Sequence, residues 1–203
     1  GVVESGINLR ETDASNKPSK RDIRIILKHK RGCMLDYYFS YGANMSKRYL
    51  EKVRNISPAS SHNGYMLNYK MVMNLKGPNF VEPAFANICF EKDAKVEGVV
   101  HELAETDLER IVASEGETYE LVEAPVTFKN QTIFAKTLRC KESTPEERPA
   151  SRRYMKILIA AAIENKLSSD YVKFLKNKKS VYYPVLSEIF AIRVYFWVKI
   201  RAR

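Results

Sequence analysis

The chain alternates between stretches with the hydrophobic period of a strand and stretches with that of a helix. Short runs rich in β-branched and aromatic residues predict strands over 35–41, 66–75, 84–90, 96–103, 118–128 and 132–139. Apolar residues at helical spacing predict helices over 47–54, 107–115, 151–167 and 169–177. Because several strands precede the longest helix, we expect an α/β (α+β) fold in which helices flank a small, mixed, barrel-like sheet.

The beginning of the chain differs from this pattern. Residues 1–34 are polar and basic, so we expect a flexible leader, although the largely β-branched run 23–27 could add a strand. The leader lacks the apolar stretch of a secretory signal. Residues 35–203 are long enough for one domain with a hydrophobic core, ending in a basic extension from about residue 178.

The end of the chain is apolar as well as basic. Glu188, Arg193 and Lys199 interrupt the apolar segment 181–200, and each would be costly in hydrocarbon, so we expect no membrane span. The run 194–198 has the composition of a strand or a docking segment. If its own domain does not cover it, this surface favours self-association, and a homodimer is one expected assembly.

The first candidate for chemistry is the turn after the strand 35–41. The strand breaks at Gly42 and Asn44, and Ser46 is the predicted N-cap of the following helix. Free backbone N–H groups in such a turn, together with the positive end of the helix dipole, can bind a carboxylate or a developing oxyanion. Turns of this kind are more often plain connections, so the pattern alone does not decide between an anion-binding turn and a plain connection.

The second candidate is Glu115. The spacing of Thr106 and Glu109 is that of a capping box, which predicts a short helix that begins at Thr106 and ends before Gly116. Glu115 would then lie at the negative end of the helix dipole, where ionisation of its carboxyl group is opposed. Such a group suits proton transfer near neutral pH, whereas the plainer alternative is a solvated surface charge.

Four segments in order resemble the γ-glutamylcyclotransferases and their AIG2-like relatives, over about residues 36–177. Residues 38–45, with the sequence YFSYGANM, resemble the family signature YFxYGSNM. Residues 85–88 resemble the family's ANI strand, and residues 96–103 its VxGVVxEL strand. The pair Glu115-Gly116 follows, with Tyr119 just beyond.

The resemblance implies a fold, a reaction and a site. The fold is a small barrel with flanking helices, and residues 35–203 would form the catalytic domain. The α-amine of a γ-glutamyl group attacks its own side-chain carbonyl, which closes 5-oxoproline and releases the attached amine or amino acid. Glu115 matches the catalytic glutamate, acting as general base and then acid. The residues that match the family's substrate-binding positions are Tyr38, Phe39, Ser40, Tyr41, Gly42, Ala43, Asn44 and Tyr119.

The family uses no metal or organic cofactor, so the implied partner is a small γ-glutamyl molecule. Glutathione, γ-glutamyl dipeptides, γ-glutamylamines and γ-glutamyl-tagged biosynthetic intermediates all fit the shared glutamyl head. Tyr119 can equally be a core residue, because the chain has 12 tyrosines.

The chain departs from the family pattern at several positions. Ala43 replaces the usual Ser but keeps the small size that the turn needs, so we expect little loss. Val112 replaces an Asp found in many members, and Leu138 falls where some members have a substrate-contacting Tyr. His101 replaces a common aromatic residue, and a packed histidine is favoured there over a catalytic one.

The formal net charge of +10 raises the question of nucleic acid. Residues 1–35, 36–149 and 150–203 carry net charges of +4, −3 and +9, so the basic residues belong to the ends and not to the motif-bearing centre. Nucleic acid is therefore disfavoured. The alternative function is a diverged, non-catalytic family member that binds an acidic partner or nucleic acid through its basic ends.

The three cysteines, Cys33, Cys89 and Cys140, are scattered, without a CxxC pair and without His at ligand spacing. We therefore expect reduced thiols, a cytoplasmic protein and no metal site.

Overall fold

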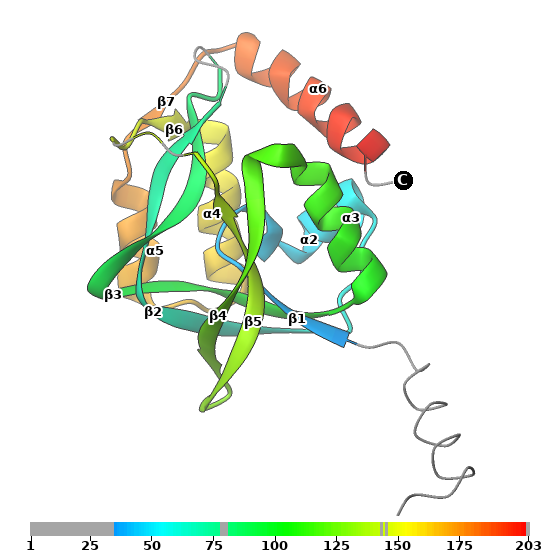
Figure 1. Cartoon of the computed structure of the whole chain (residues 1–203). Coiled ribbons are helices and arrows are strands. Elements are labelled where there is room, and N and C mark those ends of the chain that lie inside the picture. Colours follow the sequence, from blue (N-terminus) through cyan, green and yellow to red (C-terminus); the bar gives the residue numbers. More distant parts are fainter. Residues whose placement is uncertain (1–34, 78–80, 143, 145, 202–203) are drawn as a thin grey trace, which may run out of the picture. The chain divides into compact units, whose positions relative to one another are not determined.

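Five strands close into a barrel in the order β1-β3-β2-β4-β5 (Figure 1). They are β1 (Leu35–Ser40), β2 (Ser60–Lys76), β3 (Ala84–Ala104), β4 (Tyr119–Phe128) and β5 (Gln131–Cys140). β1 pairs antiparallel with β3 and parallel with β5, while the other pairs are antiparallel. The sheet is therefore mixed, and the barrel with flanking helices confirms the predicted fold class.

The coordinates are a computed structural model that describes residues 35–77, 81–142, 144 and 146–201. The described residues belong to one compact unit that begins at Leu35. The predicted leader and its optional strand 23–27 lie outside the described residues.

The two longest strands correct the sequence prediction. The segments 84–90 and 96–103 were expected as separate strands, but they are parts of the continuous strand β3, and β2 begins at Ser60 and not near 66. The polar residues between the two segments do not end the strand, because β3 keeps its pairing with β2 across an irregularity between Leu67 and Tyr69. There Asn68 has a positive φ of 61° and its side-chain oxygen accepts a hydrogen bond from the Asp93 N–H, at 3.0 Å. A local bulge therefore accommodates the polar residues that lie between the two predicted strands.

The described residues form the four predicted helices, with shifted ends, and one further helix that was not predicted. They are α2 (Lys47–Tyr49), α3 (Glu105–Glu115), α4 (Arg152–Glu164), α5 (Ser169–Asn177) and α6 (Leu186–Arg201). Ser46 caps α2 as predicted, because its side chain accepts a hydrogen bond from the Tyr49 N–H. The predicted capping box at Thr106 is wrong: α3 starts directly after the last residue of β3, Ala104, without a side-chain cap. Gly116, with a φ of 72°, ends α3 as predicted.

The hydrophobic core consists of two clusters of buried residues. The larger one fills the barrel and the contact with α4 and α5, and includes Phe39, Met66 and Leu158. The smaller one joins β1 to α3 through Tyr38, Leu108 and residues around them. Two short parallel strands, β6 (Ala150–Ser151) and β7 (Ser180–Val181), connect the helical regions. The smaller cluster fixes α3 against β1, and with it the end of α3 that carries Glu115.

The C-terminal segment is a helix, so of the two alternatives for the run 194–198, a strand or a docking segment, the strand is wrong. Because the barrel is closed, it offers no free edge to which the run 194–198 could add. The segment forms α6 instead, which packs near α3 and near the π-helical turn Leu50–Arg54 that follows α2 (Figure 1). Within the described part of the chain, no helix combines the length and apolar character that a membrane span requires.

Candidate functional site

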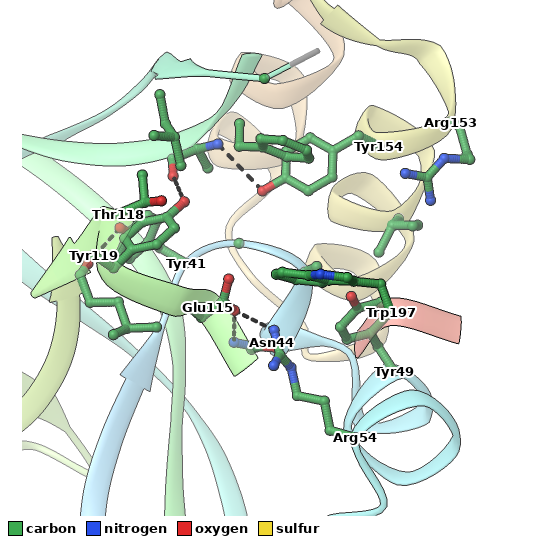
Figure 2. A pocket seen from close by; sticks show the side chains of 18 of the residues that line it. Tyr41, Asn44, Tyr49, Arg54, Glu115, Thr118, Tyr119, Arg153, Tyr154 and Trp197 are labelled. Carbon is green, nitrogen blue, oxygen red and sulfur yellow. Dashed lines mark hydrogen bonds and ion pairs between the residues drawn. The ribbon is translucent and has the colours of Figure 1, made fainter. Parts of the chain in front are cut away.

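A cavity of about 840 Å³ lies between the barrel, α4 and α6 (Figure 2). The turn after β1, the end of α3, the start of β4 and one face of α6 all contribute to it. Predicted site residues that line the cavity are Tyr38, Tyr41, Gly42, Ala43, Asn44, Glu115 and Tyr119. Two predicted residues do not line it: Phe39 is in the barrel core, and Ser40 points to Val99 and His101.

The turn after β1 is a single 3₁₀ turn, Ala43–Met45. The Met45 N–H donates to the Gly42 carbonyl at 3.0 Å, whereas the N–H groups of Ala43 and Asn44, the first two of the turn, have no acceptor among the described residues. Space is limited at Gly42, because a Cβ at this position would lie 3.2 Å from the Tyr154 hydroxyl oxygen. The turn therefore presents free backbone donors at the cavity wall, as a site for an anion or oxyanion requires.

Glu115 lies beside this turn and lines the same cavity. Its side chain is 22% exposed, and its Oε1 accepts a hydrogen bond from Asn44 Nδ2 at 3.4 Å and forms an ion pair with Arg54. Both contacts use Oε1, and Oε2 has no partner among the described residues (Figure 2). The structure thus brings together two stretches that are far apart in the sequence.

Arg54, which the sequence did not single out, organises this end of the cavity. Its side chain is only 3% exposed and lies in a π-helical turn, Leu50–Arg54, that continues α2. Arg54 Nε donates to Asn44 Oδ1 at 2.7 Å, and its two terminal nitrogens bond to Ser114 and Glu115. Burial opposes the charge, but the Glu115 carboxylate and the neighbouring tyrosines outweigh it and raise the pKa of Arg54. In the sequence Arg54 resembles the exposed basic residues of the same helix, and only the π turn shows that it points inward.

Tyrosines form the floor of the cavity. Tyr41 donates to the Leu138 carbonyl at 2.6 Å and Tyr119 donates to the Ala86 carbonyl at 2.9 Å. The Tyr38 hydroxyl accepts from Asn44 Nδ2 at 3.1 Å, and the Tyr154 hydroxyl accepts from the Ala86 N–H at 3.4 Å. Burial raises the pKa of all four phenols, which stay neutral. They shape the cavity without exchanging protons.

His101 fixes the turn from behind. Its ring is fully buried, and Nε2 lies 3.0 Å from the Asn44 carbonyl oxygen, while Nδ1 lies 2.8 Å from Ser61 Oγ. A carbonyl can only accept, so Nε2 carries the proton and Nδ1 accepts from the Ser61 hydroxyl. Burial lowers the pKa of His101 to about 4, which keeps the ring neutral near pH 7. The structure confirms the prediction that His101 is a packed histidine.

The other end of the cavity is basic. Lys76, Arg153 and Arg193 line it, on β2, α4 and α6 respectively. Arg153 forms a 2.6 Å ion pair with the buried Glu82, whose carboxylate also bonds to the Ser151 hydroxyl. Trp197 on α6 also lines the cavity (Figure 2). The sequence offered no motif for these residues, because they come from segments outside the recognised signatures.

Comparison with known families and structures agrees with the motifs. A sequence model of the AIG2-like family matches residues 95–175. No curated protein matches the sequence of the chain significantly. Among solved structures, an uncharacterized protein from Homo sapiens has a TM-score of 0.67 and 22% identity, covering 79% of this chain and 98% of its own.

Two further structures share the fold. A γ-glutamyl cyclotransferase has a TM-score of 0.65 and 20% identity over 78% of this chain and 99% of its own. YkqA from Bacillus subtilis has a TM-score of 0.62 and 19% identity over 78% of this chain and 59% of its own. Residues 95–175 thus match the AIG2-like family, within a chain that has the fold of γ-glutamyl cyclotransferase, and both findings support the family resemblance seen in the motifs.

Proposed function

We propose that the protein is a γ-glutamyl cyclotransferase. The α-amine of a γ-glutamyl group attacks the side-chain carbonyl carbon, the bond to the attached amine breaks, and 5-oxoproline and the free amine are released. The observation that carries the proposal is the placement of Glu115. Its carboxylate is held by Arg54 and Asn44 and lines the same cavity as the turn that carries the free N–H groups.

The reaction needs one proton acceptor that later becomes a donor. Because the attack is intramolecular, the protein contributes chiefly by folding the substrate into a ring-closing conformation. Glu115 Oε2 would take the proton that the α-ammonium must lose before it can attack. The same group would then return the proton to the leaving nitrogen, so that no net proton is consumed.

The backbone N–H groups of Ala43 and Asn44 would stabilise the charge that develops on the carbonyl oxygen. These donors are fixed in direction before the substrate binds, so no reorganisation is needed during the reaction. Arg54 holds Glu115 through Oε1 and leaves Oε2 for the substrate. Asn44 links the two halves, since its side chain bonds to Arg54, Glu115 and Tyr38 and its carbonyl to His101.

The alternative function, binding of an acidic partner through the basic ends, has less support. In the basic segment of α5, Lys173 pairs with Asp170 at 3.2 Å, and beyond α5 Lys178 pairs with Glu147 at 2.5 Å. Part of the positive charge is therefore already neutralised.

The test is direct detection of product. The protein is incubated with glutathione, γ-glutamyl dipeptides and γ-glutamylamines, and 5-oxoproline is measured by mass spectrometry. Glu115→Gln should remove turnover, whereas Glu117→Gln, at an exposed position two residues away, should not. Product formation that survives Glu115→Gln would remove Glu115 from its proposed role. No product from any γ-glutamyl compound, with tight salt-dependent binding of nucleic acid, would favour the alternative.

A further inference from the structure

The cavity has two chemically different ends. At one end Arg54 and Glu115 satisfy each other. Across the cavity, Lys76, Arg153 and Arg193 bring positive charge without a second acidic side chain in the lining. In Figure 2, Arg153 and Glu115 lie well apart, with Trp197 between them in the view. The basic end is therefore separate from the proposed site of ring closure.

Neighbouring side chains hold Arg153 in place at this end of the cavity. Glu82, whose side chain is 1% exposed, holds it through a 2.6 Å bond to one terminal nitrogen. Glu82 is itself fixed by the Ser151 hydroxyl at the start of α4. The Nε–H of Arg153 is buried and has no acceptor among the described residues. The other terminal nitrogen, Nη1, also has no partner among the described residues, so a ligand oxygen in the cavity can accept from it.

Lys76 and Arg193 add positive charge at the same end of the cavity. Neither Lys76 nor Arg193 forms an ion pair within the described part of the chain, and both line the cavity beside Arg153. Clefts lined by charge of one sign attract ligands of the opposite sign, and low-dielectric walls strengthen the effect. A neutral or cationic leaving group would leave these charges uncompensated.

The size and lining of the cavity indicate how large the rest of the ligand is and how apolar it is. At about 840 Å³ the cavity is in the range that holds drug-sized molecules, far more than a glutamyl head needs. Its wall between the two ends is aromatic and aliphatic. The residues of this wall are Tyr49, Phe85, Tyr154, Ile157, Phe190 and Trp197.

We propose that the substrate's leaving amine carries both an anionic group, bound by Arg153, and a bulky apolar group, packed against Trp197. This inference rests on the proposed cyclotransferase function. The anion is a carboxylate or a phosphorus oxyanion, because the planar guanidinium can bind either through parallel N–H bonds. Arg153 and Arg193 are then specificity-determining residues, and Glu82 is a positioning residue that acts through Arg153.

The test uses three compounds that share the scissile amide and the phenyl ring. They are γ-glutamylphenylalanine, its phosphonate analogue and γ-glutamylphenethylamine, which lacks the anion. For the intact protein we expect kcat/KM to be about 10- to 100-fold higher for one or both anionic compounds than for the neutral one. Which anionic compound is favoured distinguishes a carboxylate from a phosphorus oxyanion.

Single substitutions test which side chains cause the preference for the anionic compounds over the neutral one. Arg153→Gln should reduce it to within about 3-fold, through KM and not kcat, since the lost contact is present in ground state and transition state alike. Arg153→Lys should retain part of it, because Lys keeps the charge and loses the fork geometry. Arg193→Gln disturbs no ion pair among the described residues and should lower the preference without affecting folding. The matched control is Arg152→Gln, at the exposed neighbouring position, which should keep the full preference.

Binding separates this inference from the proposed reaction. In the Glu115→Gln background, calorimetry compares γ-glutamylphenylalanine with γ-glutamylphenethylamine, with and without Arg153→Gln. Tighter binding of the anionic compound, lost on Arg153→Gln, supports the subsite even if the intact protein makes no 5-oxoproline, in which case only the reaction fails. Equal binding of the two compounds, or binding of neither, overturns the subsite.

Discussion

The two ends of the cavity are built on different principles. At the Glu115 end, one network of hydrogen bonds joins Arg54, Asn44, Ser114 and Glu115, and His101 supports it from behind. At the Arg153 end, only one of the three cations, Arg153, has an acidic partner among the described residues, and its Nε–H has no acceptor there. In the proposed reaction, the groups for the chemical step are therefore already held by their protein partners, while the groups proposed to recognise the leaving part keep donors without acceptors in the described part of the chain.

The largest effect should come from removing the proton carrier. Glu115→Gln should lower kcat by about 10²- to 10⁴-fold, because an amide cannot take the substrate proton. The amide oxygen can still accept from Arg54, so the melting temperature should change little. Single-turnover assays and thermal unfolding measure both quantities. Glu115→Ala is the poorer variant, since it leaves the buried charge of Arg54 without its carboxylate, so that loss of activity and loss of stability could not be told apart.

Removing Arg54 tests whether the network is a single unit. Arg54→Met should lower the free energy of unfolding by about 3 kcal/mol, because three polar partners lose their donor in a buried site. Activity should fall as well, since Glu115 and Asn44 lose their orientation. Urea unfolding with Arg48→Met as the exposed control measures the difference. Equal stability of the two variants would show that the network does not hold the site together.

Burial of His101 predicts that the stability of the protein depends on pH. His101 has a folded-state pKa of about 4, below the value near 6.5 of an unfolded chain. The unfolded chain therefore binds more protons between these values, and stability falls as the pH drops from about 6.5 to about 4, by up to about 3 kcal/mol from this group. Urea unfolding between pH 7 and pH 4 measures the slope.

The matched variants for this slope are His101→Gln and His62→Gln. The first should be less stable at pH 7 and should lose much of the slope, because it removes the titrating group. His62→Gln should keep the slope. A slope unchanged by His101→Gln would mean that other groups cause the acid sensitivity.

The smallest effect concerns the space beside the turn. Gly42→Ala would place a methyl group 3.2 Å from the Tyr154 hydroxyl oxygen, which is tighter than ordinary contact. We expect a modest fall in kcat/KM, of about 10-fold, as the substrate or Tyr154 shifts, with little change in stability. Ala43→Ser, which restores the residue usual in the family, should leave activity nearly unchanged. A larger loss from Ala43→Ser than from Gly42→Ala would contradict the turn geometry.

Local patterns predicted most of the fold because strands and helices follow from nearby residues. The boundaries that failed depended on partners elsewhere. The strand β3 continues through polar residues because β2 pairs with it on both sides of them, and α6 is a helix although its composition favours a strand. In each case tertiary packing outweighed local propensity.

The candidate site divides in the same way. The motif around residues 38–45 and the Glu115-Gly116 pair were visible in the sequence, because the turn and the end of a helix are local features. Arg54, Arg153 and Trp197 were not, since each looks like an ordinary surface or core residue until the chain folds. By itself the sequence determined the family resemblance and the candidate for the proton carrier. Only the tertiary structure decided which cations and aromatic rings surround that carrier, because their roles depend on burial and on distances between segments remote in the chain.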